Sequence, residues 1–276
     1  MAVDFECKDR YDINDLISIV QVLRAPGGCP WDREQTHESI KKNFIEETYE
    51  VIEAINKKSP DMLREELGDV LLQVALHTEM EREKGTFTFD DVANDIVQKL
   101  VIRHPHVFGD VSAKSGEEAL ASWDAAKAKS KGTKSQTQAM LSVPRELPAL
   151  MRAQKIQHKA AKAGFDWDNA DGAVDKLYEE INELKTAVSQ GSQAEIEDEF
   201  GDVLFSCVNI ARFLKVDSEE ALTAATDKFL ARYEITERLA QEAGIDMKEA
   251  SIEVLDDLWE KAKKIKNDSI RNGGKL

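Results

Sequence analysis

Apolar and acidic positions run side by side along the segment from Glu46 to Leu71. The apolar residues form two helical stripes separated by a short break, so the segment predicts two helices joined by a turn. Ser59 and Pro60 place that turn near residue 58, because serine is a favoured N-cap and proline is tolerated in the first helical turn. Each predicted helix nevertheless carries acidic residues close to the stripe that it should bury.

The same pattern returns in the second half of the chain. EETYEVIEAI (46–55) aligns with EEINELKTAV (179–188), and EELGDVLLQV (65–74) aligns with DEFGDVLFSC (198–207). A Gly-x-x-Trp-Asp sequence precedes both hairpins, and Lys-x-x-x-Arg and then Trp-x-x-x-Lys follow them. Five shared features in one order indicate that an ancestral helical domain was duplicated.

A stretch without apolar periodicity separates the two copies. It runs from Ala126 to Pro148, is rich in Lys, Ser, Thr and Gln, and ends in two prolines. We therefore predict an N-terminal domain over 1–127, a linker over 128–145 and a C-terminal domain over 146–276. Six prolines in 276 residues, with many Ala, Leu, Glu and Lys, predict an all-α fold in both domains.

Charge and cysteine content limit the classes of partner. The net charge of -16, without a basic tract, disfavours a nucleic-acid backbone as a partner. No segment has the length and apolarity of a membrane span or a signal peptide. Three cysteines that form no CxxC pair are typical of a reducing compartment, so we expect a cytoplasmic protein.

Counting outward from the two turns brings acidic residues together. In an antiparallel hairpin, residues at equal distances from the turn face each other, and residues three apart on a helix share a face. The count gathers four carboxylates in each half: Glu47, Glu50, Glu66 and Asp69 in the first, and Glu180, Glu183, Glu199 and Asp202 in the second. Gly68 and Gly201 are expected to let the paired helices approach closely.

Four carboxylates in one patch need a positive charge among them. Two unit charges 4 Å apart repel by ~4 kcal/mol at an effective dielectric near 20. A single Glu-x-x-Glu pair is usually a solvated surface, but two pairs repeated at the same spacing favour a metal site. Oxygen ligands without histidine indicate Mg²⁺, with Mn²⁺ as a possible substitute.

Cationic residues downstream of each hairpin suit phosphate. Lys228 and Arg232 lie one helical turn apart, and a pair kept in both copies predicts a clamp for phosphate oxygens. Trp259 and Lys263 are spaced in the same way, either as core packing or as an aromatic and a cation beside a nucleotide. Lys176 precedes Glu180 by one turn and is a further candidate for a phosphate contact.

Motifs throughout the chain resemble the MazG family of nucleoside triphosphate pyrophosphohydrolases, which belongs to the all-α NTP pyrophosphatase superfamily. The resemblance covers both domains, and five segments carry it: GGCPWDREQTHESI, EETYEVIEAI, ELGDVLLQV, RHPHVFGD and PALMRAQKIQHKAAKAGFDW. It implies Mg²⁺-dependent hydrolysis of NTPs and dNTPs to the monophosphate and pyrophosphate, a homodimer, and control of nucleotide pools.

The resemblance also implies roles for individual residues. In the C-terminal domain the metal ligands and catalytic carboxylates would be Glu180, Glu183, Glu199 and Asp202, with Glu179 and Asp198 as auxiliary acids. The nucleotide would contact Lys176, Lys228, Arg232, Trp259 and Lys263. The first domain keeps its carboxylates, but Asn43 stands at the position of Lys176, so we expect the C-terminal domain to be the catalytic one.

Two other functions remain open from the sequence. One is a pyrophosphohydrolase specific for a single or non-canonical nucleotide, and the other is a non-catalytic dimeric interaction module that uses metal or nucleotide only structurally.

Overall fold

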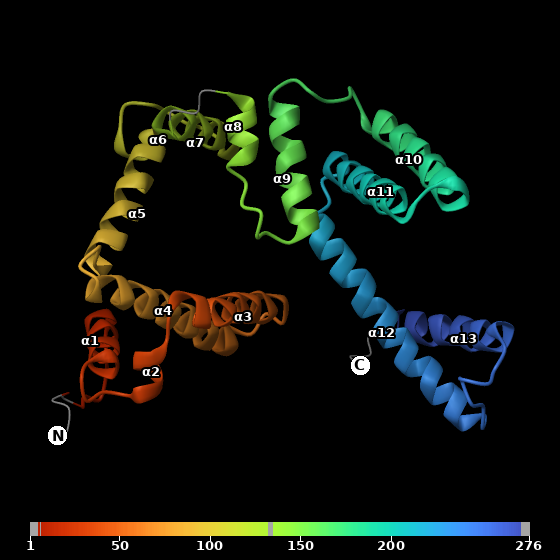
Figure 1. Cartoon of the computed structure of the whole chain (residues 1–276), viewed down its shortest axis with the longest axis horizontal. Helices are drawn as coiled ribbons and strands as arrows, with labels where there is room; N and C mark the ends of the chain where they lie inside the picture. Colours follow the sequence, from red (N-terminus) through yellow and green to blue (C-terminus); the bar gives the residue numbers. More distant parts are fainter. Residues whose placement is uncertain (1–4, 6, 132–134, 272–276) are drawn as a thin grey trace. The chain divides into compact units, whose positions relative to one another are not determined.

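The chain folds into helices throughout the part that the structure describes. This structure, a computed structural model, describes residue 5 and residues 7–131 and 135–271, and these contain no strand (Figure 1). The chain divides between residues 132 and 133 into two compact units. The prediction of an all-α fold is confirmed.

The first unit is organised around a long antiparallel hairpin, α3–α4, with α1 packed on α4 and the α5–α7 group attached at the end of α4. Its helices are α1 (Ile13–Arg24), α2 (Pro30–Glu34), α3 (His37–Asn56), α4 (Pro60–Glu83), α5 (Phe89–Arg103), α6 (Pro105–Phe108) and α7 (Gly116–Lys131).

The second unit repeats the hairpin as α10–α11, with α9 packed on α11, and pairs α12 with α13. Its helices are α8 (Gln136–Leu141), α9 (Ala149–Lys162), α10 (Ala170–Gln190), α11 (Gln193–Phe213), α12 (Ser218–Glu242) and α13 (Ile252–Arg271).

Helical turns occupy part of the segment that we expected to be a linker. Helix α7 continues to Lys131, and α8 packs against α9. Val143, just after α8, is buried. Residues 132–134 of the expected linker lie outside the described part of the chain.

Capping residues explain why both hairpins turn where the sequence predicts. The Ser59 hydroxyl accepts a hydrogen bond from the backbone N–H of Met62, and Pro60 is the first residue of α4. In the second unit Ser192 and Glu195 form a reciprocal capping box at the start of α11. Such caps satisfy backbone N–H groups that a helix leaves free at its start, and so fix where the second helix of each hairpin begins.

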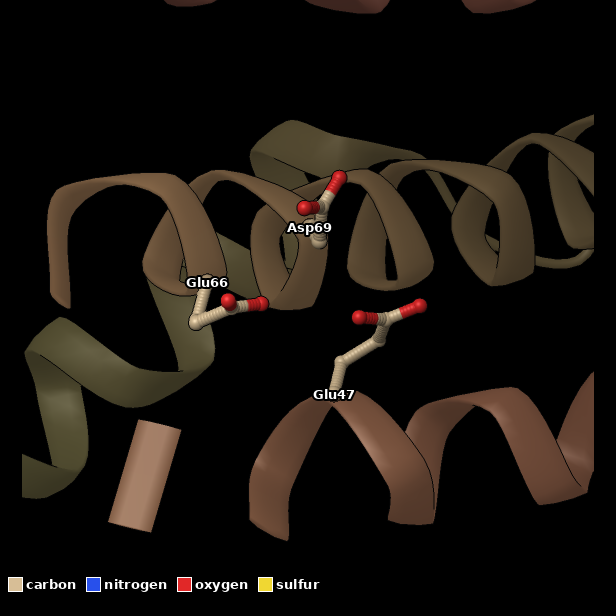
Figure 2. A group of neighbouring side chains, drawn as sticks. All are labelled: Glu47, Glu66 and Asp69. Carbon is tan, nitrogen blue, oxygen red and sulfur yellow. The ribbon is translucent and has the colours of Figure 1, made fainter. Parts of the chain in front are cut away.

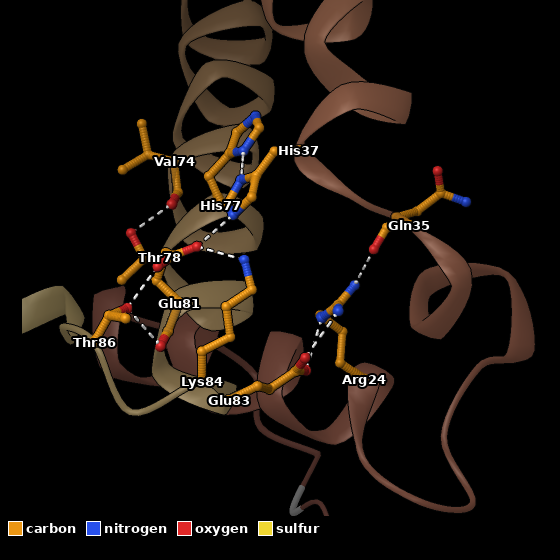
Figure 3. A network of polar contacts seen from close by, with 10 residues as sticks. All are labelled: Arg24, Gln35, His37, Val74, His77, Thr78, Glu81, Glu83, Lys84 and Thr86. Carbon is orange, nitrogen blue, oxygen red and sulfur yellow. Dashed lines mark hydrogen bonds and ion pairs between the residues drawn. The ribbon is translucent and has the colours of Figure 1, made fainter.

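Polar contacts tie the far end of the first hairpin (Figure 3). The rings of His37 on α3 and His77 on α4 stack with centroids 5.0 Å apart, and their Nδ1 atoms lie 2.7 Å apart. The other ring nitrogen of His37 lies 2.7 Å from a carboxylate oxygen of Glu81. The hairpin is therefore held at both ends, by its capped turn and by this cluster.

Arg24 connects α1 and α2 to the same end of α4. Its buried guanidinium donates to both carboxylate oxygens of Glu83, at 2.8 and 2.9 Å, and to the backbone oxygens of Asp32 and Gln35. A planar, five-donor guanidinium suits this combination of a bidentate ion pair and two carbonyls. In the second unit Arg212 makes a comparable bidentate pair with Asp166, between the end of α11 and the loop before α10.

We expect Arg24→Ala to lower the free energy of unfolding of the first unit by about 2 kcal/mol, because it leaves Glu83 and two carbonyls without their buried donor. Thermal or urea unfolding would measure the loss. The matched control is Arg33→Ala, which removes an exposed arginine from the neighbouring helix α2 and should change stability by less than about 0.5 kcal/mol. Equal stability of the two variants would contradict the assignment.

Candidate metal and nucleotide site

Three carboxylates converge between the helices of the first hairpin (Figure 2). Glu47 projects from α3 toward α4, which carries Glu66 and Asp69. One oxygen of each lies within 4.8 Å of the others, and all three side chains are half-buried. This arrangement follows from the antiparallel register, which sets Glu47 opposite the part of α4 that carries Glu66 and Asp69.

The second hairpin builds the same group from Glu180 on α10 and from Glu199 and Asp202 on α11, again with ligand oxygens within 4.8 Å of one another. Glu180 is 5% exposed, so its charge is largely removed from water. A carboxylate buried to this degree requires a cationic partner or a proton.

The fourth predicted carboxylate of each half lies at the edge of its group. Glu50 and Glu183 do not belong to the groups of three, yet each hydrogen-bonds to the first glutamate of its own group, Glu47 or Glu180. Each half thus has a tight group of three with a fourth acid in contact. We call each set of four a carboxylate cradle. The predicted auxiliary acids Glu179 and Asp198 are exposed and lie outside the group of three.

Crowding changes the acidity of these groups. Burial, the hydrogen bond with Glu50 and the nearby charge of Asp69 together raise the pKa of Glu47 above its ordinary value. Burial and the charges of Glu50, Glu65 and Asp69 raise the pKa of Glu66. In the second cradle, burial and the contact with Glu180 raise the pKa of Glu183. Raised carboxyl pKa values mean that the folded protein holds these charges at a cost.

Lys176 distinguishes the second cradle from the first. Its ammonium lies 2.7 Å from Glu180 and 2.8 Å from Glu179, and these two acids raise the pKa of the lysine. The lysine reaches the cradle along its own helix, as its i,i+4 spacing from Glu180 allows. Asn43 occupies the matching place in the first half, so that cradle has no such cation on α3.

The donor set fits a hard divalent cation. Each group of three offers only carboxylate oxygens, close enough together to share one ion. Burial, and after it the neighbouring carboxylates, raise the pKa values of Glu47 and Glu66, and a bound cation would offset both effects. Glu47, Glu66 and Asp69 could hold one such ion, and Glu180, Glu199 and Asp202 another.

Gly68 and Gly201 do not have the role that we expected. A Cβ atom added to either glycine would meet nothing within 4 Å, so neither is required for close approach of the paired helices. The expectation was wrong because both glycines lie on an exposed side of their helix. In both copies the residue before the cradle aspartate is therefore a glycine with open space around it.

Except for Lys176 on α10, the residues predicted to bind the nucleotide lie on α12 and α13, away from the carboxylates. Helix α12 leads away from α10 and α11, and α13 packs on α12 (Figure 1). Lys228 is exposed, and the Nε atom of Arg232 is buried without a hydrogen bond to any described residue. Lys263 forms an ion pair with Glu260, and Trp259 contacts the ring of Phe229.

The first unit places the equivalent residues on α5 and α7. The Arg103 guanidinium lies 5.3 Å from the ring centre of Trp123, and the Lys127 ammonium lies 4.4 Å from it. The Nε atom of Arg103, like that of Arg232, is buried without a hydrogen bond to any described residue. The two corresponding arginines thus share a buried Nε–H that is available to donate to a ligand.

Two aromatic residues near this region did not emerge from the sequence. Phe229 and Tyr233 directly follow Lys228 and Arg232, and their rings lie 6.0 Å apart. The sequence does contain one signal for them. Phe229 and Tyr233 are four residues apart, as are Lys228 and Arg232, so the two aromatic rings lie one helical turn apart.

Fold and site define a class: a tandem all-α protein in which each half carries a helical hairpin with a carboxylate cradle. The model of the MazG nucleotide pyrophosphohydrolase domain matches this chain twice, over residues 35–108 and 170–236. These matches include all eight cradle carboxylates. The chain belongs to the MazG family.

Three relatives are similar in sequence to this chain over nearly its whole length. The nucleoside triphosphate pyrophosphohydrolase/pyrophosphatase MazG of Thermotoga maritima is 49% identical over 249 residues, which cover 90% of this chain and 94% of that protein. The nucleoside triphosphate pyrophosphohydrolase of Escherichia coli K12 is 45% identical over 91% of this chain and 97% of its own length. An uncharacterized Bacillus subtilis protein, YabN, is 45% identical, but the match covers only 53% of it.

None of the described helices combines the length and apolarity that crossing a membrane requires.

We expect Glu47→Gln to stabilise the metal-free protein. Because the pKa of Glu47 is raised on folding, the folded chain binds more protons than the unfolded chain, and stability falls as pH rises above the ordinary glutamate pKa. At pH 7.5 with a chelator, the variant should melt a few degrees higher than wild type, on the scale of ~1 kcal/mol, and lose part of the decline in stability with pH.

The control is Glu53→Gln, on the same helix, which removes an exposed carboxylate paired with Lys57 at 2.7 Å and should not stabilise. A Glu47→Gln protein that melts lower than wild type in chelator would contradict the electrostatic account of the cradle.

Proposed function

We propose that this protein is a nucleoside triphosphate pyrophosphohydrolase that hydrolyses NTPs and dNTPs to the nucleoside monophosphate and pyrophosphate with Mg²⁺, or Mn²⁺ in its place. We place it in the cytoplasm, where it would control nucleotide pools. The observation that carries the proposal is the duplicated cradle of carboxylate oxygens in a member of the MazG family.

The C-terminal cradle is proposed as the catalytic one. Glu180, Glu199 and Asp202 would hold Mg²⁺. When bound there, the ion would supply Lewis-acid polarisation of phosphoryl oxygens and a more acidic water. Lys176 supports this choice, because it is the cationic side chain that already reaches the second cradle and has no counterpart on α3.

The chain's own residues would position the substrate and move one proton. A water attacks the α-phosphorus, the bond from that phosphorus to the bridging oxygen breaks, and pyrophosphate leaves. Glu183 is suited to accept the proton of the water, because burial and its contact with Glu180 raise its pKa toward the working pH. Arg232, Lys228 and Lys263 would bind the phosphate oxygens and stabilise the charge that develops on the leaving pyrophosphate.

We further propose that the working form is a homodimer. The chain exposes 20068 Å², whereas two separate compact units of half its length would together expose only about 14,000 Å². Helix α5 has an apolar stripe but no buried residue, and Val97, Leu100 and Ile102 on it are among the exposed large apolar side chains. Such faces suit burial against a second copy.

A second copy would also complete the active site. In one chain the cradle lies on α10–α11, while the cationic residues lie on α12–α13. We propose that the α12–α13 pair of one chain supplies Lys228 and Arg232 to the cradle of its partner. The open space beside Gly201 supports this arrangement, because it leaves room next to Asp202 for a closely approaching helix or nucleotide.

The activity is tested by pyrophosphate release from a panel of NTPs and dNTPs with Mg²⁺. We expect Glu180→Gln to abolish turnover and Glu47→Gln to retain most of it. Partial loss in both variants would indicate two working sites per chain. Turnover of one nucleotide alone would replace the broad activity with a specific one, and no release by the wild type from any nucleotide would favour a non-catalytic interaction module.

The shared site is tested by mixing two inactive variants. Glu180→Gln lacks a cradle ligand and Arg232→Ala lacks the clamp, so a mixed dimer should contain one intact composite site. After co-refolding at equal amounts, we expect about a quarter of wild-type activity, since half of the dimers are mixed and each has one of two sites intact. Activity no higher than the sum of the two separate variants would contradict a shared site.

A further inference from the structure

Two histidines and a glutamate form a chain of polar contacts between α3 and α4 (Figure 3). The Nδ1 atoms of His37 and His77 lie 2.7 Å apart, and Nε2 of His37 lies 2.7 Å from a carboxylate oxygen of Glu81. His37 is the first residue of α3, and the other two lie one turn apart near the end of α4. These three residues, which we call the histidine triad, therefore join the two helices at the end of the hairpin farthest from its turn.

The carboxylate of the triad decides where its protons lie. Hydrogen bonds from Lys84, Thr86 and His37 lower the pKa of Glu81 to about 2, so this side chain is ionised and can only accept. His37 therefore carries a hydrogen on the Nε2 atom that faces Glu81. A hydrogen bond between the two Nδ1 atoms then needs a hydrogen on one of them and a lone pair on the other.

This arrangement accommodates one added proton but not two. One added proton makes one ring an imidazolium, which donates to the Nδ1 atom of its neutral neighbour, so the contact between His37 and His77 remains a hydrogen bond. After a second proton both Nδ1 atoms carry hydrogen, and two positively charged rings meet at a contact of 2.7 Å. The link between the helices is then repulsive.

The surroundings of the pair offer little compensation for two charged rings. The Lys84 ammonium that binds Glu81 adds a further positive charge. Phe44 on α3 presents an apolar ring to His77, with 5.8 Å between the ring centres. Glu38 and Lys41 on α3 and Asp90 on α5 are exposed. Other charged groups on α4 and on the helices packed against it have partners of their own: Glu79 with Arg82, Glu83 with Arg24 of α1, and Asp91 of α5 with Thr88.

The second half of the chain lacks the triad. In the alignment that matches the two cradles, the places of His37, His77 and Glu81 are occupied by Ala170, Ile210 and Leu214. The duplicated hairpin can therefore be built without these polar contacts, and the first hairpin has gained groups that titrate near neutral pH.

We propose that the histidine triad is a pH-sensitive latch, which holds the far end of the first hairpin closed near neutral pH and releases it in mild acid when both rings are protonated. The latch acts on the hairpin that carries the first cradle, and it involves neither a cradle carboxylate nor the nucleotide. It is therefore independent of the proposed function.

The direction of the pH dependence follows from His77. Burial, and after it the charge of His37, lower the pKa of His77 on folding. The folded chain therefore binds fewer protons than the unfolded chain below the ordinary histidine pKa, near ~6.5. The stabilisation is fully present above that value and is lost as the pH falls toward the folded pKa. The raised pKa values of the first cradle act in the opposite direction, so the two effects differ in sign.

The test is a double-mutant cycle on the full chain with His37→Ala, His77→Ile and the double variant, which carry the residues of the second half. Melting temperatures are measured in chelator at about pH 7.5 and about pH 5.5, on either side of the ordinary histidine pKa. At the higher pH we expect the two single losses to exceed the loss in the double variant by a few degrees, because each single change already breaks the contact. At the lower pH this coupling should disappear.

A second measurement needs no stable variant of the pair. The chain has five histidines, so their ring signals can be followed by NMR as the pH is lowered. In the wild type His77 should titrate below the ordinary histidine value, and in His37→Ala it should move toward that value. His158 of the second unit, whose pKa is lowered by burial and then by Arg212, is the internal control and should not move.

Two results would overturn the latch. One is a coupling between His37 and His77 that is the same at both pH values, which would make the contact an ordinary structural link. The other is a wild-type His77 that titrates at or above the ordinary histidine value, which would mean that the folded hairpin accepts its charge without cost.

Discussion

Repulsion between like charges is the constraint on which both halves of this protein depend. Three carboxylate oxygens lie within 4.8 Å of one another in each cradle, and each pair at such distances costs a few kcal/mol at an effective dielectric near 20. A domain's whole stability is ~5–15 kcal/mol. The hairpins must therefore be held from outside the cradles, by the caps at Ser59 and Ser192 and by contacts such as those of Arg24 and Arg212.

The two copies meet this constraint differently. In the second, Lys176 approaches Glu180 and neutralises part of the charge from within the same helix. In the first, Asn43 offers no charge, and burial together with neighbouring carboxylates raises the pKa values of Glu47 and Glu66. The difference between Lys176 and Asn43 thus separates a cradle that has a cation on its first helix from a cradle that has none there.

Local rules made much of this arrangement predictable. Helical period, a serine before a proline and equal counts from each turn were enough to predict the hairpins and the residues that face one another. Other features depend on packing that those rules do not contain. The sequence alone does not show whether Gly201 faces open space or a tightly packed neighbour. The direction of α12 after α11 depends on contacts with α9, which lies many residues earlier in the chain. The i,i+4 spacing of Phe229 and Tyr233 does not by itself distinguish two neighbouring exposed rings from an ordinary helix surface.

Separation of Arg232 from the cradle carboxylates has a physical advantage. If Arg232 reached Glu180 within one chain, the two would form a buried ion pair, which would fill the cradle and be strongly destabilising to break. Holding them on different helix pairs leaves the buried arginine nitrogen without a hydrogen bond to any described residue and the cradle free to bind cations. An ion and a triphosphate placed between them would satisfy both, because the ion binds carboxylate oxygens and phosphate, and the arginine binds phosphate alone. In the proposed complex, the substrate would supply the negative charge that the arginine lacks, and the ion would supply positive charge to the carboxylates.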